Sequence, residues 1–253
     1  MVHTLNPRKQ TCGFTGFALK RIAVCSMVID HIGSIVMDGV IAPYRVNDTI
    51  ILTADMPFFV RNAFLIKTIC AALGSAAFPL FCFLVAEGFI HTRNRLRYAG
   101  LLALFALLSE VPYDVAHYQT VLDFSLQNVL FTLCVGVFTL YGISRAEQKS
   151  PAIRFWLTAL CIAAGGCVSY LLRSEYVFLG IAAISLFYLL RGSRWKIAGI
   201  APLLVASPWV LLAVPALLLY NGARGRGSKY FFYIFYPAHF LLLAGWAYLL
   251  ANR

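Results

Sequence analysis

Residues 64–91 read FLIKTICAALGSAAFPLFCFLVAEGFIH and decide the fold class. Only Lys67 and Glu87 are charged in this run, which as a helix is long enough to cross a membrane, since a crossing takes about 20 apolar residues. Similar runs recur through the 253 residues, of which 61% are hydrophobic and 12% charged. Soluble domains do not have such a composition. The sequence therefore predicts an all-α, polytopic integral membrane helical bundle.

Eight apolar segments are separated by polar joints or by joints that contain Gly and Pro. They cover residues 17–37, 64–91, 98–113, 126–143, 153–172, 176–190, 197–220 and 230–251. The seventh contains Ser207-Pro208 near its middle, and a break there places more Lys and Arg residues on one side of the membrane. We therefore expect eight or nine transmembrane segments in a single domain over 1–253, with residues 38–62 as an outer interfacial loop.

The net charge of +11 is distributed as in a membrane protein. Basic residues cluster in short joints between apolar segments, as the positive-inside rule describes, and form no stripe interleaved with stacking aromatics. This excludes nucleic acid as a partner and leaves membrane lipids as the surroundings. We expect a multi-pass protein of the bacterial cytoplasmic (inner) membrane with a cytoplasmic N-terminus. Charged residues in the first segment argue against a cleaved signal peptide.

The seven cysteines show no CxxC pair and no Cys/His ligand spacing. Most of them lie inside apolar segments, where a thiol packs as a small side chain. The sequence therefore predicts no metal site.

Residues 20–33 read KRIAVCSMVIDHIG and place ionisable groups deep in a membrane helix. Such groups are costly in lipid and persist with partners or a function. Lys20 and His31 are eleven positions apart, so they share one helix face at a separation of roughly 16 Å along the axis. Asp30 points about 100° away from His31. The pattern predicts a polar cavity near mid-bilayer, with Lys20 at its inner rim.

An imidazole in such a cavity can act as a general base toward an amine or a hydroxyl. We therefore predict catalytic roles for His31 and Asp30. The structural alternatives are a hydrogen-bonded buried histidine and a Lys20 that anchors the helix at the interface.

Arg93, Arg95 and Arg97 form a basic knot after the second segment. Together with Lys20 and Arg21, they are predicted to bind the phosphates of a cytosolic nucleotide-type donor. Three such arginines are also ordinary topology determinants. Glu87, at the membrane edge, is expected to pair with one of them. The list of predicted donor-binding residues is Lys20, Arg21, Arg93, Arg95 and Arg97.

Further polar residues stand near the ends of other segments. Glu110 and Asp114 flank Pro112, which fits a helix end, and these carboxylates either face water or line the access route of an acceptor. Asn128 fits a cavity or a contact between helices. His239 follows Pro237 inside the last segment and marks a second polar spot. The predicted substrate or cavity residues are Glu87, Glu110, Asn128, Tyr236 and His239.

Several of these stretches together resemble the TraX family, within the transmembrane acyltransferase superfamily. The matching stretches are residues 20–33 with Asp30-His31, 77–81 (AFPLF), 87–94, 109–114 (SEVPYD), 220–225 (YNGARG) and 235–239 (FYPAH). The superfamily pattern of a basic residue, ten intervening positions and a histidine is met by Lys20 and His31. One departure is Ser75, which follows Gly74 where the family often has Arg, so another residue such as Lys67 would supply that contact.

The resemblance implies an enzyme that acetylates the N-terminus of pilin in conjugation. Acetyl-CoA is then the co-substrate, His31 the base and Lys20 part of the coenzyme A environment. The expected acceptor is a protein or glycan that presents an amine or a hydroxyl. Transfer is expected to be direct. An acyl-enzyme intermediate on Cys25 or Ser26 remains as an alternative.

Three other classes of protein remain as alternatives. A proton-coupled secondary transporter fits the broken helices and the buried ionisable groups, but no inverted repeat is visible. A non-catalytic scaffold for pilus or envelope assembly gives no reason for Asp30-His31 at mid-bilayer. An intramembrane peptidase lacks its motif.

Overall fold

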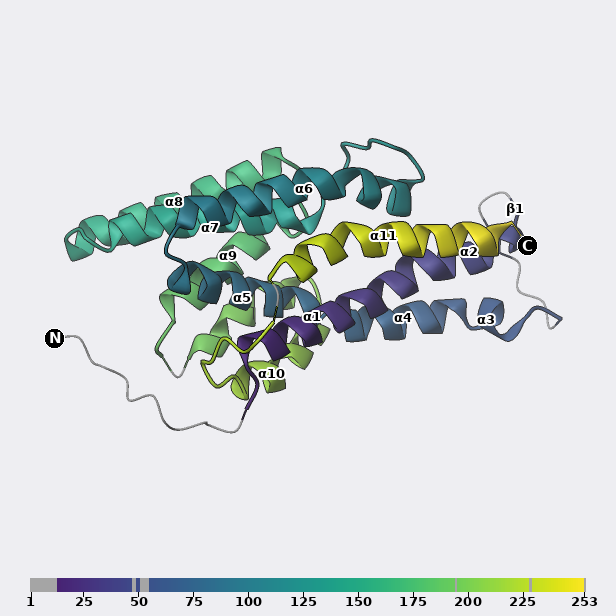
Figure 1. Cartoon of the computed structure of the whole chain (residues 1–253), viewed down its shortest axis with the longest axis horizontal. Helices are drawn as coiled ribbons and strands as arrows, with labels where there is room; N and C mark the ends of the chain where they lie inside the picture. Colours follow the sequence, from purple (N-terminus) through teal and green to yellow (C-terminus); the bar gives the residue numbers. More distant parts are fainter. Residues whose placement is uncertain (1–12, 47–48, 51–54, 194, 228, 253) are drawn as a thin grey trace.

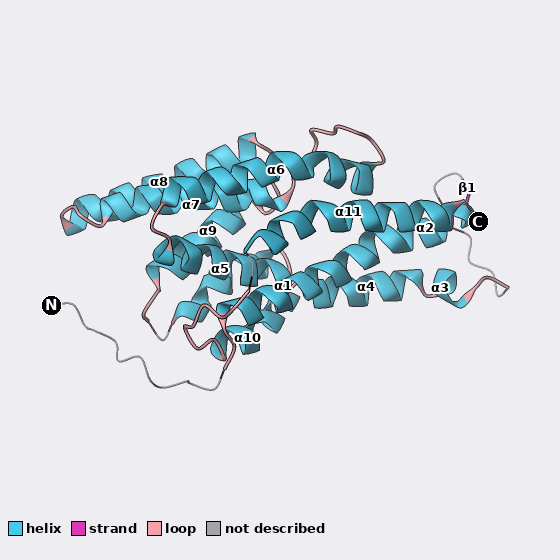
Figure 2. Cartoon of the chain, in the orientation of Figure 1, coloured by secondary structure: helices cyan, strands magenta, loops and turns pink. Residues whose placement is uncertain are grey.

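The computed structural model describes residues 13–46, 49–50, 55–193, 195–227 and 229–252. Figures 1 and 2 show an elongated bundle that is helical almost throughout. Its principal helices are α1 (Gly16–His31), α2 (Met37–Ile41), α3 (Phe58–Arg61), α4 (Ala63–Gly74), α5 (Ala77–His91), α6 (Arg95–Tyr118), α7 (Val129–Ala146), α8 (Pro151–Leu171), α9 (Val177–Leu189), α10 (Val214–Leu218) and α11 (Lys229–Ala251). Because these helices are apolar, most of them can pack against one another or against lipid.

The first crossing is longer than expected from sequence. Thr15 caps α1 by accepting a hydrogen bond from the Ala18 amide, and the helix continues through the π-helical stretch η1 (Ile32–Val36), α2 and the 3₁₀ turn η2 (Ala42–Tyr44). The loop that was predicted to lie on the outer interface therefore begins after Tyr44 rather than at residue 38. It contains the short antiparallel strands β1 (Arg45–Val46) and β2 (Thr49–Ile50).

α6 also extends beyond its predicted end. Pro112 was expected to close this helix, but it lies buried inside α6, which continues to Tyr118. Proline inside a helix removes one backbone hydrogen bond, yet neighbouring helices in a membrane bundle can hold such a helix in place. This extension adds His117 to the helical part of the chain.

Among the residues that the structure describes, six spans are long and apolar enough to cross a membrane. They are Gly16–Tyr44, Ala63–His91, Arg95–Tyr118, Val129–Ala146, Pro151–Leu171 and Tyr230–Ala251. Shorter apolar helices cover Val177–Leu189, Lys196–Val205 and Pro208–Leu218. The predicted polytopic membrane bundle is confirmed.

The expected break at Ser207-Pro208 is present. It separates the 3₁₀ helices η3 (Lys196–Val205) and η4 (Pro208–Ala213), and the Ser207 side chain caps the second by accepting from the Trp209 amide. At about 2 Å per residue, neither piece alone spans the roughly 30 Å hydrocarbon core.

The elongated bundle has two opposite ends. The Lys20 end holds the start of α1, the α5–α6 joint and the chain before α11; the Asp38 end holds α2, α3 and the tip of α11 (Figure 1). α1 packs against α4 and α5, while α11 packs against α6 and α2. The first and last helices are therefore neighbours near the middle of the molecule.

Candidate functional site

A pair of histidines joins the first and last helices. His31 Nδ1 of α1 lies 2.8 Å from His239 Nε2 of α11, and His239 Nδ1 lies 3.2 Å from the carbonyl oxygen of Phe235. A carbonyl only accepts, so His239 Nδ1 is the N–H donor and, in a neutral ring, Nε2 is the acceptor. His31 Nδ1 must then carry the other proton. The chain of contacts leaves an unprotonated lone pair on His31 Nε2.

Aromatic side chains enclose this pair. The His31 ring centroid lies 4.8 Å from that of Phe240, 5.1 Å from that of His239 and 5.7 Å from that of His117. His239 is buried, and Nε2 of His117 has no hydrogen-bond partner within the described part of the chain. A third imidazole thus completes the cluster, and sequence analysis had not singled it out.

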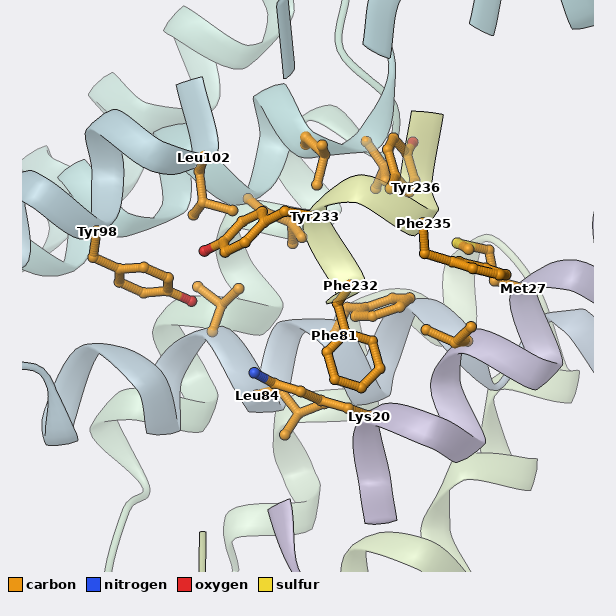
Figure 3. A pocket seen from close by; sticks show the side chains of 15 residues that line it. Lys20, Met27, Phe81, Leu84, Tyr98, Leu102, Phe232, Tyr233, Phe235 and Tyr236 are labelled. Carbon is orange, nitrogen blue, oxygen red and sulfur yellow. The ribbon is translucent and has the colours of Figure 1, made fainter. Parts of the chain in front are cut away.

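An apolar pocket of about 100 Å³ extends along α1 from Lys20 to Met27. Lys20, Val24 and Met27 line it from α1, at the spacing that His31 continues one turn later. Figure 3 shows Lys20 reaching into the pocket from α1 while Tyr98 and Tyr233 point their hydroxyls inward from α6 and α11. On α1 the pocket ends at Met27, one turn before His31, and it is apolar, whereas the sequence had predicted a polar cavity.

Tyr236 stands at the histidine end of this pocket. It lines the pocket, is buried, and its ring centroid lies 5.5 Å from that of His239. Its predicted place in the cavity agrees with this position.

The Lys20 end is built by the chain between α10 and α11. Phe14 N donates to the Leu219 carbonyl at 2.7 Å, and Gly16 N donates to the Ala223 carbonyl at 2.8 Å. Gly225 adopts a φ of +76°, and a Cβ there would meet the Thr15 hydroxyl at 2.4 Å. Only glycine permits this close approach without strain. The segment 219–227 is consequently fixed against the start of α1.

This arrangement places Arg224 near Lys20. Their like charges lie close enough to repel each other, and the Lys20 ammonium stands 5.6 Å from the Phe232 ring centroid. Neither side chain has an ion-pair partner among the described residues. Lys20 lines the pocket and Arg224 lies near Lys20, so the positive potential at this end favours an anion.

The other predicted donor-binding residues lie at the same end of the bundle. Arg21, Arg93 and Arg97 are exposed. Arg95 is half-buried: it donates to the Ser144 hydroxyl at 3.1 Å and its guanidinium lies over the Phe89 ring. Arg95 therefore helps to hold α5, α6 and α7 together.

The expected partner of Glu87 was wrong. Instead of an arginine, Glu87 accepts a hydrogen bond from the Tyr220 hydroxyl at 2.9 Å and lies 3.5 Å from His91 Nε2, one turn along its own helix. It thereby ties α5 to the chain before α11 at the Lys20 end.

Asp30 faces away from the histidines. A Cβ on Gly74 would lie 2.3 Å from the Asp30 Cβ, so Asp30 packs on α4, whereas His31 packs on α11. Its carboxylate has no hydrogen bond and no ion pair within the described ranges. The two side chains lie on different sides of α1, as the rotation of about 100° between consecutive residues predicts. Asp30 makes no hydrogen bond to the His31 ring.

Glu110, Asp114 and Asn128 lie buried between α6 and α7 rather than facing water. Asn128 caps α7, donates to the Ala106 carbonyl at 2.9 Å and also hydrogen-bonds Glu110. Asp114 accepts from the Asp123 amide at 2.8 Å. Asn128 thus joins two helices, and Asp114 organises the loop that follows α6.

Glu175 was missed by the sequence analysis. It lies in the loop between α8 and α9 and accepts a hydrogen bond from the Tyr113 hydroxyl at 3.0 Å. Burial raises the pKa of Glu175 to about 7; the charges of Asp30 and Glu110 add to the rise, and the Tyr113 hydrogen bond opposes it. The only sequence signal was a carboxylate in a short joint, Arg173-Ser-Glu-Tyr176, at the end of an apolar segment.

The chain is similar to a protein family and to a fimbrial assembly protein. The sequence model of the family described as TraX protein matches residues 15–246. A probable fimbrial assembly protein FimC, serogroup H1, of Dichelobacter nodosus is 28% identical over 263 residues, which cover 91% of this chain and 94% of that protein. No solved structure matches. The family match covers nearly the whole chain and includes all the site residues described above, so the chain belongs to the TraX family.

Proposed function

We propose that this protein is an acetyl-CoA-dependent acyltransferase of the bacterial inner membrane, acting on an amine or hydroxyl presented at the membrane. One observation carries the proposal: the His31–His239–Phe235 hydrogen-bond chain leaves an unprotonated nitrogen on His31, and an apolar pocket on the same helix runs from Lys20 to Met27, one turn before His31. A general base within reach of the acceptor's proton is what direct acyl transfer requires.

The donor enters from the Lys20 end in this proposal, which places that end and the N-terminus on the cytoplasmic side. Lys20 and Arg224 attract the phosphates of acetyl-CoA, with Arg21, Arg93, Arg95 and Arg97 adding to the positive potential. The pantetheine arm then follows the apolar pocket toward His31. The roughly 16 Å rise between Lys20 and His31 suits that extended arm.

In the transfer step, the acceptor's lone pair attacks the thioester carbonyl as His31 Nε2 takes the acceptor's proton. The new C–N or C–O bond forms, the C–S bond breaks, and the leaving thiolate takes the proton from the His31 imidazolium. His239 holds the His31 ring in the required tautomer, as an orienting partner does for other catalytic histidines.

Direct transfer is favoured over an acyl-enzyme by the position of the two nearest nucleophiles. The Ser26 hydroxyl donates to the Leu73 carbonyl at 2.6 Å and lies 3.1 Å from that of Gly74, so it faces α4. Cys25 is exposed. Neither side chain is hydrogen-bonded to His31.

The acceptor we favour is the N-terminus of a protein such as a pilin. Support comes from the TraX family and from the fimbrial assembly protein of Dichelobacter nodosus, whose name concerns assembly of a surface fibre.

The test uses purified protein in nanodiscs, acetyl-CoA with a deuterated acetyl group, and an apolar peptide with a free N-terminus. Mass spectrometry of the peptide should show the deuterated acetyl on the N-terminal nitrogen with wild-type protein. His31→Gln should abolish transfer, while His91→Gln, at an exposed histidine, should not. Equal transfer by wild type and His31→Gln would remove His31 from the reaction.

A further inference from the structure

A second cavity lies on the other side of α1 from the apolar pocket. It has a volume of about 540 Å³ and is lined by residues of α1, η1, α2 and α4. Asp30 and Ser34 line it from the first crossing, while Phe64, Lys67 and Ala71 line it from α4. The donor pathway described above uses none of these residues.

The cavity is lined by one carboxylate, that of Asp30, and by one ammonium, that of Lys67. Asp30 has neither a hydrogen bond nor an ion pair among the described residues, and the Ser34 hydroxyl is buried without a hydrogen-bond partner. Glu175 lies near enough for its charge to act on Asp30. A carboxylate inside a membrane span is costly unless a cation accompanies it.

Lys67 is not that cation. Its ammonium lies 3.0 Å from Asp38 Oδ1, and the Arg45 guanidinium lies 2.9 Å from the same oxygen. Lys67 and Arg45 thus share the single carboxylate of Asp38. Asp30 keeps no ion pair of its own among the described residues, so an ammonium that enters the cavity would find an unpaired carboxylate.

The wall formed by α4 shows from which direction a ligand arrives. Phe64, at the cavity, is 85% exposed, and Leu65, Ile69 and Leu73 on the same helix are also exposed. In a membrane span these apolar side chains face lipid. A ligand that reaches Asp30 past α4 is therefore embedded in the bilayer itself.

We propose that this cavity binds the N-terminal ammonium of an apolar polypeptide segment, with Asp30 as its counter-ion and Ser34 as an acceptor of a second hydrogen bond. The inference rests on the proposed function, since it names the binding site of an amine acceptor. The π-helical η1 begins directly after His31, and such bulges are frequent at functional sites. Asp30 and His31 are consecutive but face different sides of α1, so this cavity holds the acceptor before transfer, and the bound ammonium must lose a proton before its nitrogen can attack.

The first experiment needs no substitution. A synthetic apolar peptide of about 20 residues, labelled at its C-terminus, is titrated with wild-type protein in phosphatidylcholine nanodiscs, once with a free and once with an acetylated N-terminus. Fluorescence anisotropy should show the free amine binding at least tenfold more tightly. Equal affinities would overturn the proposal.

The second experiment locates the site. Asp30→Asn should weaken binding of the free-amine peptide about tenfold, and Ala71→Phe, which fills the cavity, should do the same. Asp55→Asn, at an exposed residue of the outer loop, should bind the peptide like wild type. Unchanged binding in both cavity variants would overturn the assignment to this cavity.

Acetyl-CoA binding by the same variants separates this inference from the proposed function. Asp30→Asn and Ala71→Phe should bind acetyl-CoA like wild type. If wild type binds the peptide through Asp30 but never binds acetyl-CoA, the proposed function fails and the amine site stands. If phosphatidylethanolamine in the nanodiscs displaces the peptide in proportion to its content, the site belongs to a lipid amine and the proposal of a polypeptide ligand is wrong.

Discussion

The two cavities beside α1 differ in size, polarity and direction. The pocket on the His31 side measures about 100 Å³, is lined almost wholly by apolar and aromatic side chains and has Lys20 at one end. The cavity on the Asp30 side measures about 540 Å³ and contains an unpaired carboxylate. One helix thus has Lys20 at the pocket on one face and the unpaired Asp30 carboxylate at the cavity on the other. The difference suits two substrates of opposite charge, a phosphate-bearing donor and an ammonium-bearing acceptor.

The largest expected effect is a loss of transfer rate when His239 is replaced. His239→Ala removes the partner that fixes the His31 tautomer and should lower the transfer rate roughly 10- to 100-fold, as loss of an orienting partner does elsewhere. His239→Gln, whose amide oxygen can accept from His31 Nδ1, should retain more activity. Rates are measured at saturating acetyl-CoA, whose dissociation constant should not change. An alanine variant as fast as wild type would deny His239 any positioning role.

Filling each cavity in turn should separate the two substrates. Val24→Phe, in the apolar pocket, should weaken acetyl-CoA binding about tenfold, which corresponds to about 1.4 kcal/mol. Ala71→Phe fills the other cavity and serves as the matched control. Isothermal titration with acetyl-CoA is the measurement. If both fillings affected the donor equally, the two cavities would not be separate sites.

Charge removal at the donor end should have a smaller effect. Lys20→Met should weaken acetyl-CoA binding roughly fivefold, because a half-exposed cation contributes on the order of 1 kcal/mol to an ion pair. Binding of acetyl-pantetheine, which lacks the phosphates, should stay unchanged. The effect should shrink at 0.5 M salt, since screening weakens such contacts. A similar loss for both ligands would mean that Lys20 contacts the arm and not the phosphates.

Glu175 should give the protein a pH-dependent stability without a change in donor binding. Its pKa of about 7 in the folded protein exceeds the value of about 4.3 expected when unfolded, so folded protein keeps the proton over that interval. Stability is therefore lost as pH rises from about 4.3 through 7. Glu175→Gln should remove this loss, which is on the order of 1 kcal/mol, and raise the melting temperature at pH 8 relative to pH 5.

Asp123 supplies a control of opposite sign for this titration. Hydrogen bonds from Ser125 hold the pKa of Asp123 below its usual range, so its contribution is present above about pH 3.9 and is lost only at lower pH. Asp123→Asn should leave the difference in melting temperature between pH 5 and pH 8 as in wild type. A Glu175→Gln protein that keeps the wild-type difference would contradict the pKa assignment.

The sequence predicted the features that depend on composition and helical period. Apolar runs gave the membrane bundle, Ser207-Pro208 gave the break in the seventh segment, and the eleven-residue spacing placed Lys20 and His31 on one face. Periodicity also predicted that Asp30 points elsewhere. These are local properties of single helices, which is why they can be inferred without the tertiary structure.

Features that depend on contacts between distant segments were not predicted. The His31–His239 pairing joins residues 208 positions apart, and nothing in either helix reveals it. His117 was missed because Pro112 was expected to end α6, although the helix continues and places His117 one turn beyond Tyr113. Glu87 was assigned to an arginine because the nearest cation in sequence was used, whereas Tyr220 comes from another part of the chain.

Acetyl-CoA binding and slow hydrolysis by purified protein test the central claim most directly, with wild type compared with His31→Ala and with Arg93→Ala/Arg95→Ala in nanodiscs. We expect saturable binding that survives His31→Ala while hydrolysis is lost, and weaker binding in the double arginine variant. If folded wild-type protein did not bind acetyl-CoA, the proposed donor site would be wrong. A proton-coupled carrier would then be the favoured function.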